Sequence, residues 1–264
     1  MLTAVQNGDA KKVAELMGQD PGFEVNMGLD RGRLTVLHHA CCEDHRSAVI
    51  PLFLAHPDID VNLKDEFGRT PFGYACFFGN TSCVRELLKD SRVKVNEKDS
   101  DGFTPLHWAA YYGHLDVIEW WIASGREVDL GEPGFRTDAI RAAKEVVDLW
   151  HSFAQNGGKT EVVALLERFK SDAAQTRDAM RVKLGLLDEL AAEVFAVVVF
   201  VSDDLLQVKD TTTPSPAARF FNIARRLPLE LQMMLCFRQV GSDTEIIPGK
   251  VSEVAFKELA MRLW

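Results

Sequence analysis

The pattern of apolar and polar positions over residues 99–130 predicts two short antiparallel helices. Leu106, Ala109 and Ala110 fall on one face of the first helix, and Gly113 then allows the chain to reverse. The second helix carries an apolar stripe of Val117, Ile118, Trp121 and Ile122. A unit of this kind cannot bury both of its apolar faces by itself, so we expect neighbouring units on both sides.

The same pattern occurs twice more upstream. Residues 65–76 align with residues 99–110 at an offset of 34, and Thr35 begins a further copy 35 residues before Thr70. Each unit ends in Val-Asn or Val-Asp, and Asx residues suit the turn that begins the next unit. These dipeptides are Val25-Asn26, Val61-Asn62, Val95-Asn96 and Val128-Asp129. The chain therefore contains an internal repeat.

The first helix of the best-formed copy begins with Thr-Pro-Leu-His at residues 104–107. Thr104 is a good N-cap, and Pro105 suits the first helical position, where a missing N–H costs nothing. This core and the repeat length resemble the ankyrin repeat. The resemblance implies an all-α fold, an ankyrin-repeat solenoid of helix-turn-helix repeats with short β-hairpin fingers, here followed by a C-terminal helical domain. The whole chain is similar to a group of fungal ankyrin-repeat proteins with a helical C-terminal extension.

We expect the ankyrin stack to occupy residues 1–170. Its parts are an N-terminal cap at 1–25, repeats at about 26–61, 62–95 and 96–129, and a degenerate repeat at 130–170. In the degenerate repeat, the first helix is predicted to run from Asp138 through VVDLWHSF. A turn at residues 156–158 and a second helix at residues 160–169 would follow.

The C-terminal helical domain is predicted at residues 171–264. The sequence from Thr176 to Val208 favours helix throughout, and residues 209–216, with two prolines, are the clearest linker. Three short amphipathic segments follow. The second of them begins with Leu-Pro-Leu-Glu-Leu at residues 227–231, which is similar to the start of an F-box.

Charge is unevenly distributed. Residues 1–130 contain 13 Lys and Arg against 20 Asp and Glu, whereas residues 131–264 contain 17 against 19. An acidic repeat region argues against nucleic acid or an anionic membrane as its partner. Basic protein segments are more natural partners.

The five cysteines form no CxxC pair and have no histidine at metal-ligand spacing. Their odd number, with no signal peptide and no apolar run long enough to span a membrane, predicts a soluble protein of the cytoplasm or nucleus. Cys41 and Cys76 replace a helix-contact alanine and should be buried, whereas Cys42 should point outward. We find no nucleophile–base pair, metal site or cofactor loop, and predict no enzymatic activity and no cofactor. For His38 and His107, the resemblance implies hydrogen bonds to neighbouring repeats.

Aromatic residues are the more informative pattern. The resemblance implies that two positions after each Ala pair, and the finger positions, face a concave surface that contacts ligands. On this chain these positions hold six aromatic residues in two adjacent repeats, more than we expect of solvent-facing positions. The ten candidate partner-binding positions, six of them aromatic, are Glu66, Phe67, Arg69, Phe77, Phe78, Ser100, Asp101, Phe103, Tyr111 and Tyr112.

We therefore predict a protein-binding scaffold whose concave aromatic cluster, rimmed by Asp99, Asp101 and Glu66, takes an extended or helical segment with apolar anchors and basic flanks. The aromatic residues would instead be structural if they fill the core, or if the C-terminal helices cover them. The alternative function is a substrate-recognition adaptor of a ubiquitin ligase, in which the F-box-like segment from Leu227 docks a linker protein.

Overall fold

A computed structural model describes residues 1–20, 22–145, 156–202, 220, 222–224, 227, 229–240 and 255. They belong to two compact units, Met1–Met180 and Arg181–Trp264. Regular secondary structure within the described residues is entirely helical.

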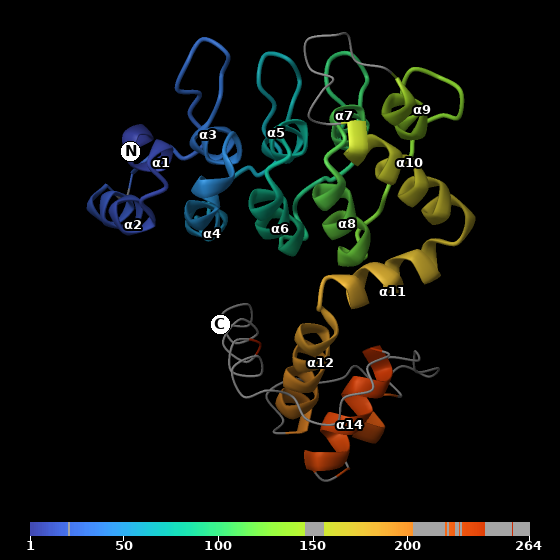
Figure 1. Ribbon diagram of the computed structural model, residues 1–264. Coiled ribbons are helices and arrows are strands. Elements are labelled where there is room, and N and C mark those ends of the chain that lie inside the picture. The colour runs from blue at the N-terminus through green and yellow to red at the C-terminus, as the bar shows by residue number, and fades with distance from the viewer. Residues whose placement is uncertain are drawn as a thin grey trace, which may run out of the picture. The chain divides into compact units, whose positions relative to one another are not determined.

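The first unit consists of short helices in two rows, drawn side by side in Figure 1. The upper row contains α1 (Leu2–Gln6), α3 (Val36–Cys41), α5 (Pro71–Phe78), α7 (Pro105–Tyr112) and α9 (Ala139–Lys144). The lower row contains α2 (Ala10–Gln19), α4 (Ile50–Leu54), α6 (Thr81–Lys89) and α8 (Leu115–Ser124), with the 3₁₀ helix η1 (Asp44–Val49) before α4. The predicted all-α stack of two-helix repeats is confirmed.

The repeated threonine begins each upper-row helix as predicted. Thr35, Thr70 and Thr104 each accept a hydrogen bond on the side-chain oxygen from the backbone N–H three residues later. This bond satisfies one of the N–H groups that a helix start leaves unpaired. Pro71 and Pro105 occupy the first turn.

Glycine ends two of these helices and turns the chain toward the lower row. Gly79 and Gly113 adopt left-handed conformations with φ of 74° and 76°. At Gly79 the turn also packs closely, because a Cβ atom there would lie 2.4 Å from Nδ1 of His114. Glycine is therefore required at Gly79 both by its backbone conformation and by the space available.

The core of the first unit lies between successive repeats. Its largest fully buried side chains include Trp121, Phe72, Leu87 and Leu106. The rings of Phe72 and Trp121 meet edge to face with centroids 4.9 Å apart, and Trp121 Nε1 donates to the carbonyl of Glu127 at 3.0 Å. Each repeat thus supplies apolar side chains that its neighbour buries.

The fingers are tight turns rather than paired strands. Two backbone bonds close each finger: Asp65 N donates to the carbonyl of Arg69 and Gly68 N to that of Asp65, at 3.0 and 3.1 Å, and Asp99 N donates to the carbonyl of Phe103 and Gly102 N to that of Asp99, both at 3.0 Å. A further bond, from Ser100 N to the carbonyl of Phe67 at 2.9 Å, connects one finger to the next. These bonds hold the fingers in a row without forming the β-ladder of a hairpin.

The Val-Asn dipeptide recurs once per repeat, and the side chains of its asparagines form hydrogen bonds to the backbone of the next repeat. Asn26 donates from Nδ2 to the carbonyl of Asp58 at 2.6 Å and accepts at Oδ1 from Asp60 N at 2.9 Å. Asn62 does the same with Arg92 and Lys94, at 2.9 and 2.7 Å. The dipeptide therefore connects repeats as well as beginning a turn.

Residues 130–180 depart from the expected pattern. α9 ends at Lys144, because Glu145 is extended, so the helix predicted to continue through VVDLWHSF stops early; residues 146–155 lie outside the described residues. α10 (Asn156–Ser171) begins at the three residues predicted to form a turn. Gly158 lies against Gly113, where a Cβ would be 2.7 Å from the carbonyl oxygen.

The prediction of unbroken helix from Thr176 is wrong at one place. α11 (Ala173–Lys183) ends before Gly185, which has a φ of 68°, and α12 (Leu187–Ser202) follows. In the second unit, α12 packs against α14 (Leu229–Val240) around a buried core. That core contains Ala191, Ala192, Phe195, Ala196, Val198, Ala224, Cys236 and Ala255. The predicted linker at residues 209–216 lies outside the described residues.

No helix in the described part of the chain has the length and apolar character needed to cross a bilayer.

Candidate functional site

The six aromatic residues singled out by the sequence come together on the first unit. Phe77 and Phe78 end α5, Tyr111 and Tyr112 end α7, and the other two lie in the fingers before these helices. Trp108 of α7 and Arg69 of the second finger join them. We call this set the aromatic face: Phe67, Arg69, Phe77, Phe78, Phe103, Trp108, Tyr111 and Tyr112.

Ring contacts connect the two repeats across the aromatic face. The ring of Phe77 lies 4.9 Å from that of Tyr112 and 5.3 Å from that of Trp108, measured between centroids. Trp108 in turn lies 5.1 Å from Phe103, and Tyr111 lies 5.1 Å from Tyr112. Edge-to-face contacts at these distances are favourable aromatic pairs.

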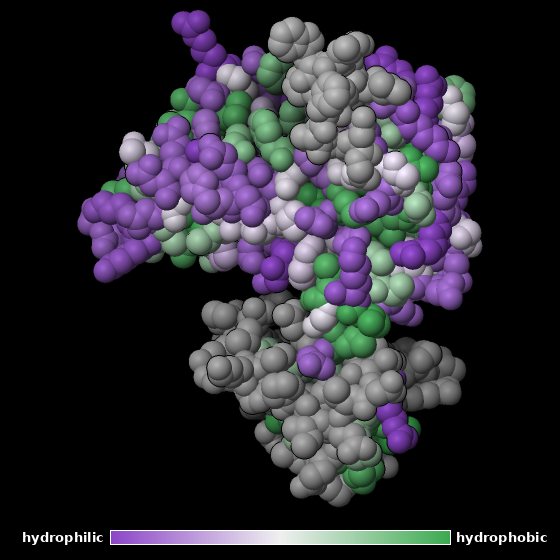
Figure 2. Space-filling model, in the orientation of Figure 1, coloured by the Kyte–Doolittle hydropathy of each residue, from purple (hydrophilic) through white to green (hydrophobic). Residues whose placement is uncertain are grey.

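Two rings of the face extend furthest into solvent. Phe67 is 54% exposed and Phe78 is 48% exposed, whereas Phe77, Phe103, Tyr111 and Tyr112 are half-buried. The aromatic face thus consists of half-buried rings together with two exposed rings, Phe67 and Phe78. By contrast, the side of the first unit seen in Figure 2 is mainly hydrophilic, with smaller hydrophobic areas.

Arg69 lies at the centre of the aromatic face. Its guanidinium carbon is 4.4 Å from the ring centroid of Phe77, 5.3 Å from that of Trp108 and 5.7 Å from that of Phe67. These separations are within the range of cation–π attraction. The arginine therefore contacts rings from both repeats.

An aspartate at the start of each finger fixes a side chain nine positions later. Asp65 Oδ2 accepts from the hydroxyl of Tyr74 at 2.7 Å, and Asp99 Oδ2 accepts from Trp108 Nε1 at 2.8 Å. In the first repeat, Oδ2 of Asp30 lies 3.4 Å from Nε2 of His39 at the same spacing. The finger thereby orients an aromatic ring of its own repeat.

This arrangement corrects the expected rim. Asp99 Oδ1 accepts from the N–H groups of Asp101 and Phe103, at 3.1 and 2.9 Å, so both oxygens of Asp99 serve the fold. Of the other residues predicted for the rim, Glu66 and Asp101 are exposed, and so is Ser100 beside Asp101.

Four further residues at the face were missed from the sequence: Tyr74, Trp108, Arg136 and Lys159. The guanidinium carbon of Arg136 is 4.7 Å from the ring centroid of Phe103, and Lys159 Nζ is 5.1 Å from that of Tyr111. The spacing of nine from each finger aspartate would have identified Tyr74 and Trp108. No sequence signal marked Arg136 or Lys159, because both come from the degenerate repeat.

His38 connects two repeats, as the resemblance implied for it, and His114 does so as well. His38 Nδ1 accepts from Thr35 N at 3.2 Å, and its Nε2 lies 3.1 Å from the carbonyl of Arg69 in the next repeat. His114 Nε2 lies 3.1 Å from the carbonyl of Phe77 in the preceding repeat. Burial lowers the pKa of both imidazoles, and also that of His107.

The cysteines are free thiols in protected surroundings. Cys41 and Cys76 are fully buried, as predicted, and burial raises the pKa of each well above its usual value. Cys42 corrects the prediction of an outward thiol. It is half-buried, its Sγ donates to the carbonyl of His38 at 3.3 Å, and burial raises its pKa to about 11. A thiol with such a pKa is unreactive at neutral pH.

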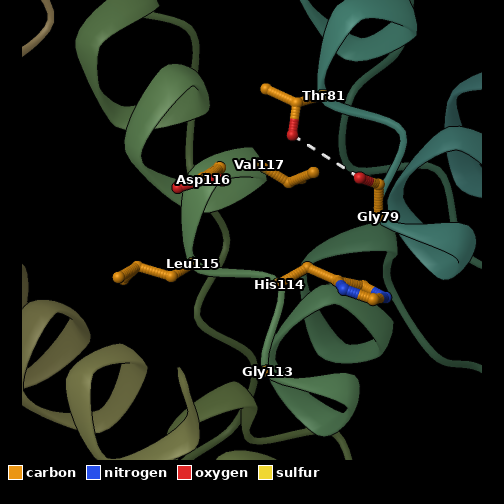
Figure 3. Close-up of a pocket in the computed structure, with 7 residues that line it drawn as sticks. All are labelled: Gly79, Thr81, Gly113, His114, Leu115, Asp116 and Val117. Atoms are coloured by element: carbon orange, nitrogen blue, oxygen red, sulfur yellow. Dashed lines mark hydrogen bonds between the residues drawn. The ribbon is translucent and has the colours of Figure 1, made fainter. Parts of the chain in front are cut away.

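A small cavity of ≈ 220 Å³ lies where the helix turns of two repeats meet, shown in Figure 3. Its lining includes the imidazole of His114, the carboxylate of Asp116 and the hydroxyl of Thr81. The imidazole and the hydroxyl both lie at hydrogen-bond distance from backbone carbonyls, those of Phe77 and Gly79. Two of the three polar side chains in the lining thus already contact the backbone. The described residues also contain no cluster of three side chains suited to a metal ion.

Comparison with known families agrees with the geometry. The profile of the family described as ankyrin repeats (3 copies) matches residues 1–99 and 37–131. This part of the chain consists of ankyrin repeats, which form the all-α solenoid described above.

Similarity to curated proteins is confined to short stretches. The chain is 47% identical over 55 residues to the SMC5-SMC6 complex localization factor protein 1 of Homo sapiens, which is 21% of this chain and 5% of that protein. The Bos taurus protein of the same name gives the same figures. Rabankyrin-5 of Homo sapiens is 38% identical over 68 residues, 26% of this chain and 6% of the relative. The chain thus matches only about a twentieth of the length of these relatives.

Proposed function

We propose that this protein is a non-enzymatic interaction scaffold whose aromatic face binds a segment of another protein. Ankyrin repeats themselves indicate a role in protein–protein interaction. The observation that carries the more specific proposal is the pair of exposed rings, Phe67 and Phe78, supported by half-buried rings from two repeats. Clustered exposed aromatic side chains are characteristic of binding sites and make efficient anchors.

The chemistry of the face defines the partner. Its rings favour apolar side chains, presented by an extended or helical segment. Glu66 and Asp101 are exposed on neighbouring fingers, so basic residues flanking the apolar anchors would meet negative charge at the edges. One relative is named a localization factor for a protein complex, which is in line with a recruiting role.

A catalytic role finds no support in the chemistry of the described groups. The histidines His38 and His114 contact backbone carbonyls, and burial holds the described thiols in the protonated form. Because all five cysteines are free, we further propose that the protein works in a reducing compartment, the cytoplasm or the nucleus. Within this proposal, residues 171–264 form a helical domain separate from the repeats.

The experiment is an affinity purification with the full chain as bait. The test variant is Phe67→Ser/Phe78→Ser, which removes the two exposed rings and leaves the buried core in place. Met27→Ser is a matched control, because Met27 is 51% exposed and lies outside the face. Circular dichroism and chemical denaturation verify that all three proteins are folded.

We expect a partner that binds the wild type and Met27→Ser but not the double variant. That partner is then purified, and its affinity for the three proteins is measured by calorimetry. If every captured protein binds the double variant as tightly as it binds the wild type, the aromatic face is not the binding site.

The adaptor alternative rests on the segment that begins at Leu227. α14 starts at Leu229, within this segment, and Leu231 on α14 is 47% exposed and accessible to a second protein. Co-purification of a Skp-type linker protein that is lost on Leu231→Asp would support the adaptor. A complex that forms without such a linker favours the simple scaffold.

A further inference from the structure

We propose that Arg69 recognises a carboxylate of the partner, so that the aromatic face selects an acidic residue set beside apolar anchors. This inference rests on the proposed function and adds the chemical identity of the central contact. The inference is based on the surroundings of the Arg69 side chain.

The guanidinium of Arg69 has ring neighbours but no counter-ion within the described residues. Three ring centroids lie between 4.4 and 5.7 Å from its central carbon. Its Nε is buried and has no hydrogen-bond partner in the described part of the chain. A guanidinium that has ring neighbours but no counter-ion favours an incoming carboxylate, because charge-assisted hydrogen bonds are stronger than neutral ones.

Glu66, three positions before Arg69, is exposed and forms no ion pair with it in the described residues, and the aspartates that begin the two neighbouring fingers are already engaged. Asp65 Oδ1 accepts from the N–H groups of Phe67 and Arg69, at 3.0 and 2.7 Å, and its Oδ2 accepts from Tyr74. Asp99 is equally occupied by its own finger and by Trp108. Each aspartate thus already accepts three hydrogen bonds within the fold, and neither forms an ion pair with Arg69 in the described part of the chain.

The outer part of the Arg69 side chain remains accessible. The residue as a whole is half-buried, and only Nε of its three nitrogens is both buried and unpartnered in the described structure. The two terminal nitrogens are not among the fully buried unpartnered atoms, and they donate no hydrogen bond within the described residues. A carboxylate that approaches there would accept two parallel N–H bonds, the strongest geometry for arginine.

The same arrangement excludes a basic residue from the centre of the face. A lysine or arginine of the partner would normally be attracted to a group of aromatic rings, but Arg69 already occupies the space over Phe77 and Trp108. A second cation would meet like charge in a partly desolvated site. Basic residues are favoured only at the edges, near Glu66 and Asp101.

The experiment selects peptides from a displayed library of random 12-residue sequences on the immobilised full chain. Parallel selections use Arg69→Gln, Arg69→Glu and the Phe67→Ser/Phe78→Ser variant. Arg168→Gln is the matched control, because Arg168 is an exposed arginine of α10. Denaturation curves show which variants retain the wild-type fold, and Arg69→Lys provides a charge-preserving variant.

We expect wild-type selections to be enriched in Asp or Glu at a fixed spacing from an apolar residue. Synthetic peptides of the selected sequences should bind Arg69→Gln at least about tenfold more weakly than the wild type, and bind Arg168→Gln normally. Arg69→Lys should give intermediate affinity, because lysine keeps the charge but not the paired geometry. Arg69→Glu should select Lys or Arg at the same position.

Two contrary results are distinguishable. Peptides that require Phe67 and Phe78 but show no acidic enrichment, or bind Arg69→Gln as tightly as the wild type, would overturn the role of Arg69 and leave the proposed function standing. If no selected peptide depends on the two phenylalanines, the proposed function fails, and the role of Arg69 fails with it.

Discussion

Trp108 donates from Nε1 to Oδ2 of Asp99 at 2.8 Å, and this bond fixes the largest ring of the aromatic face to the finger of its own repeat. The same carboxylate accepts two backbone N–H groups of that finger. Asp65 repeats the arrangement with Tyr74, nine positions later. A single aspartate thus shapes the finger and orients the ring, so the turn of each repeat determines where a ring of that repeat lies.

Asp99→Ala should destabilise the protein by about 1–3 kcal/mol, because it leaves part-buried donors without an acceptor. Trp108→Phe removes only one donor and should cost less. Urea denaturation of both single variants and the double variant would give their coupling energy, and a coupling near zero would show that the two residues act independently. Asp101→Ala is the control, since its side chain is exposed and should have almost no effect.

Leu87→Ala and Trp121→Ala should each lose about 3–5 kcal/mol, because both side chains are fully buried between repeats. Phe78→Ala should cost less than about 1 kcal/mol, since its ring is 48% exposed. Phe77→Ala and Tyr112→Ala should fall between these limits, because their rings are half-buried. Equal losses in all five variants by chemical denaturation would mean that the aromatic face belongs to the core.

Gly79→Ala should be more destabilising than Gly102→Ala, although both glycines have positive φ, of 74° and 84°. A Cβ at Gly102 meets nothing within 4 Å, so alanine there bears only the backbone cost of about 1–2 kcal/mol. At Gly79 the Cβ would also collide with the ring of His114, at 2.4 Å. Thermal unfolding of the two variants measures the difference, and an equal loss of stability would show that His114 moves aside freely.

Stability should fall as the pH drops below about 6.5. Burial lowers the pKa of His38, His107 and His114 below the ordinary histidine value of about 6.5, so the unfolded chain binds more protons than the native one in this range. The contribution of these groups is therefore complete above pH 6.5 and is lost on acidification. Protonation of Nδ1 in His38 would also remove its acceptance of the Thr35 N–H bond.

The measurement is the free energy of unfolding of the wild type and His38→Gln at pH 7.5, 6.5 and 5.5. The variant should be less stable than the wild type at pH 7.5 and show a weaker dependence on pH. Identical slopes for the two proteins would exclude His38 as a source of the dependence.

The repeats and most of the face could be predicted from the sequence because their determinants are local. Threonine N-caps, glycine turns and the apolar stripes around Trp121 act within one repeat, and the spacing of the repeats brings equivalent positions into register. Phe77 and Tyr112 lie at the C-terminal ends of equivalent helices, so a periodic fold alone places them side by side.

The tertiary structure decided which polar groups remain available. Asp99 was predicted to meet a partner, but its oxygens are used by backbone and indole N–H groups that only the folded finger brings to it. Arg69 was one of ten candidate residues, and its lack of a counter-ion in the described chain depends on contacts between two repeats. Lys159, more than forty residues beyond Tyr111, reaches its ring through the degenerate repeat. Short-range periodicity in the sequence is therefore sufficient to predict the stack of repeats. The pairing of charged side chains depends on long-range packing and cannot be read from a local sequence pattern.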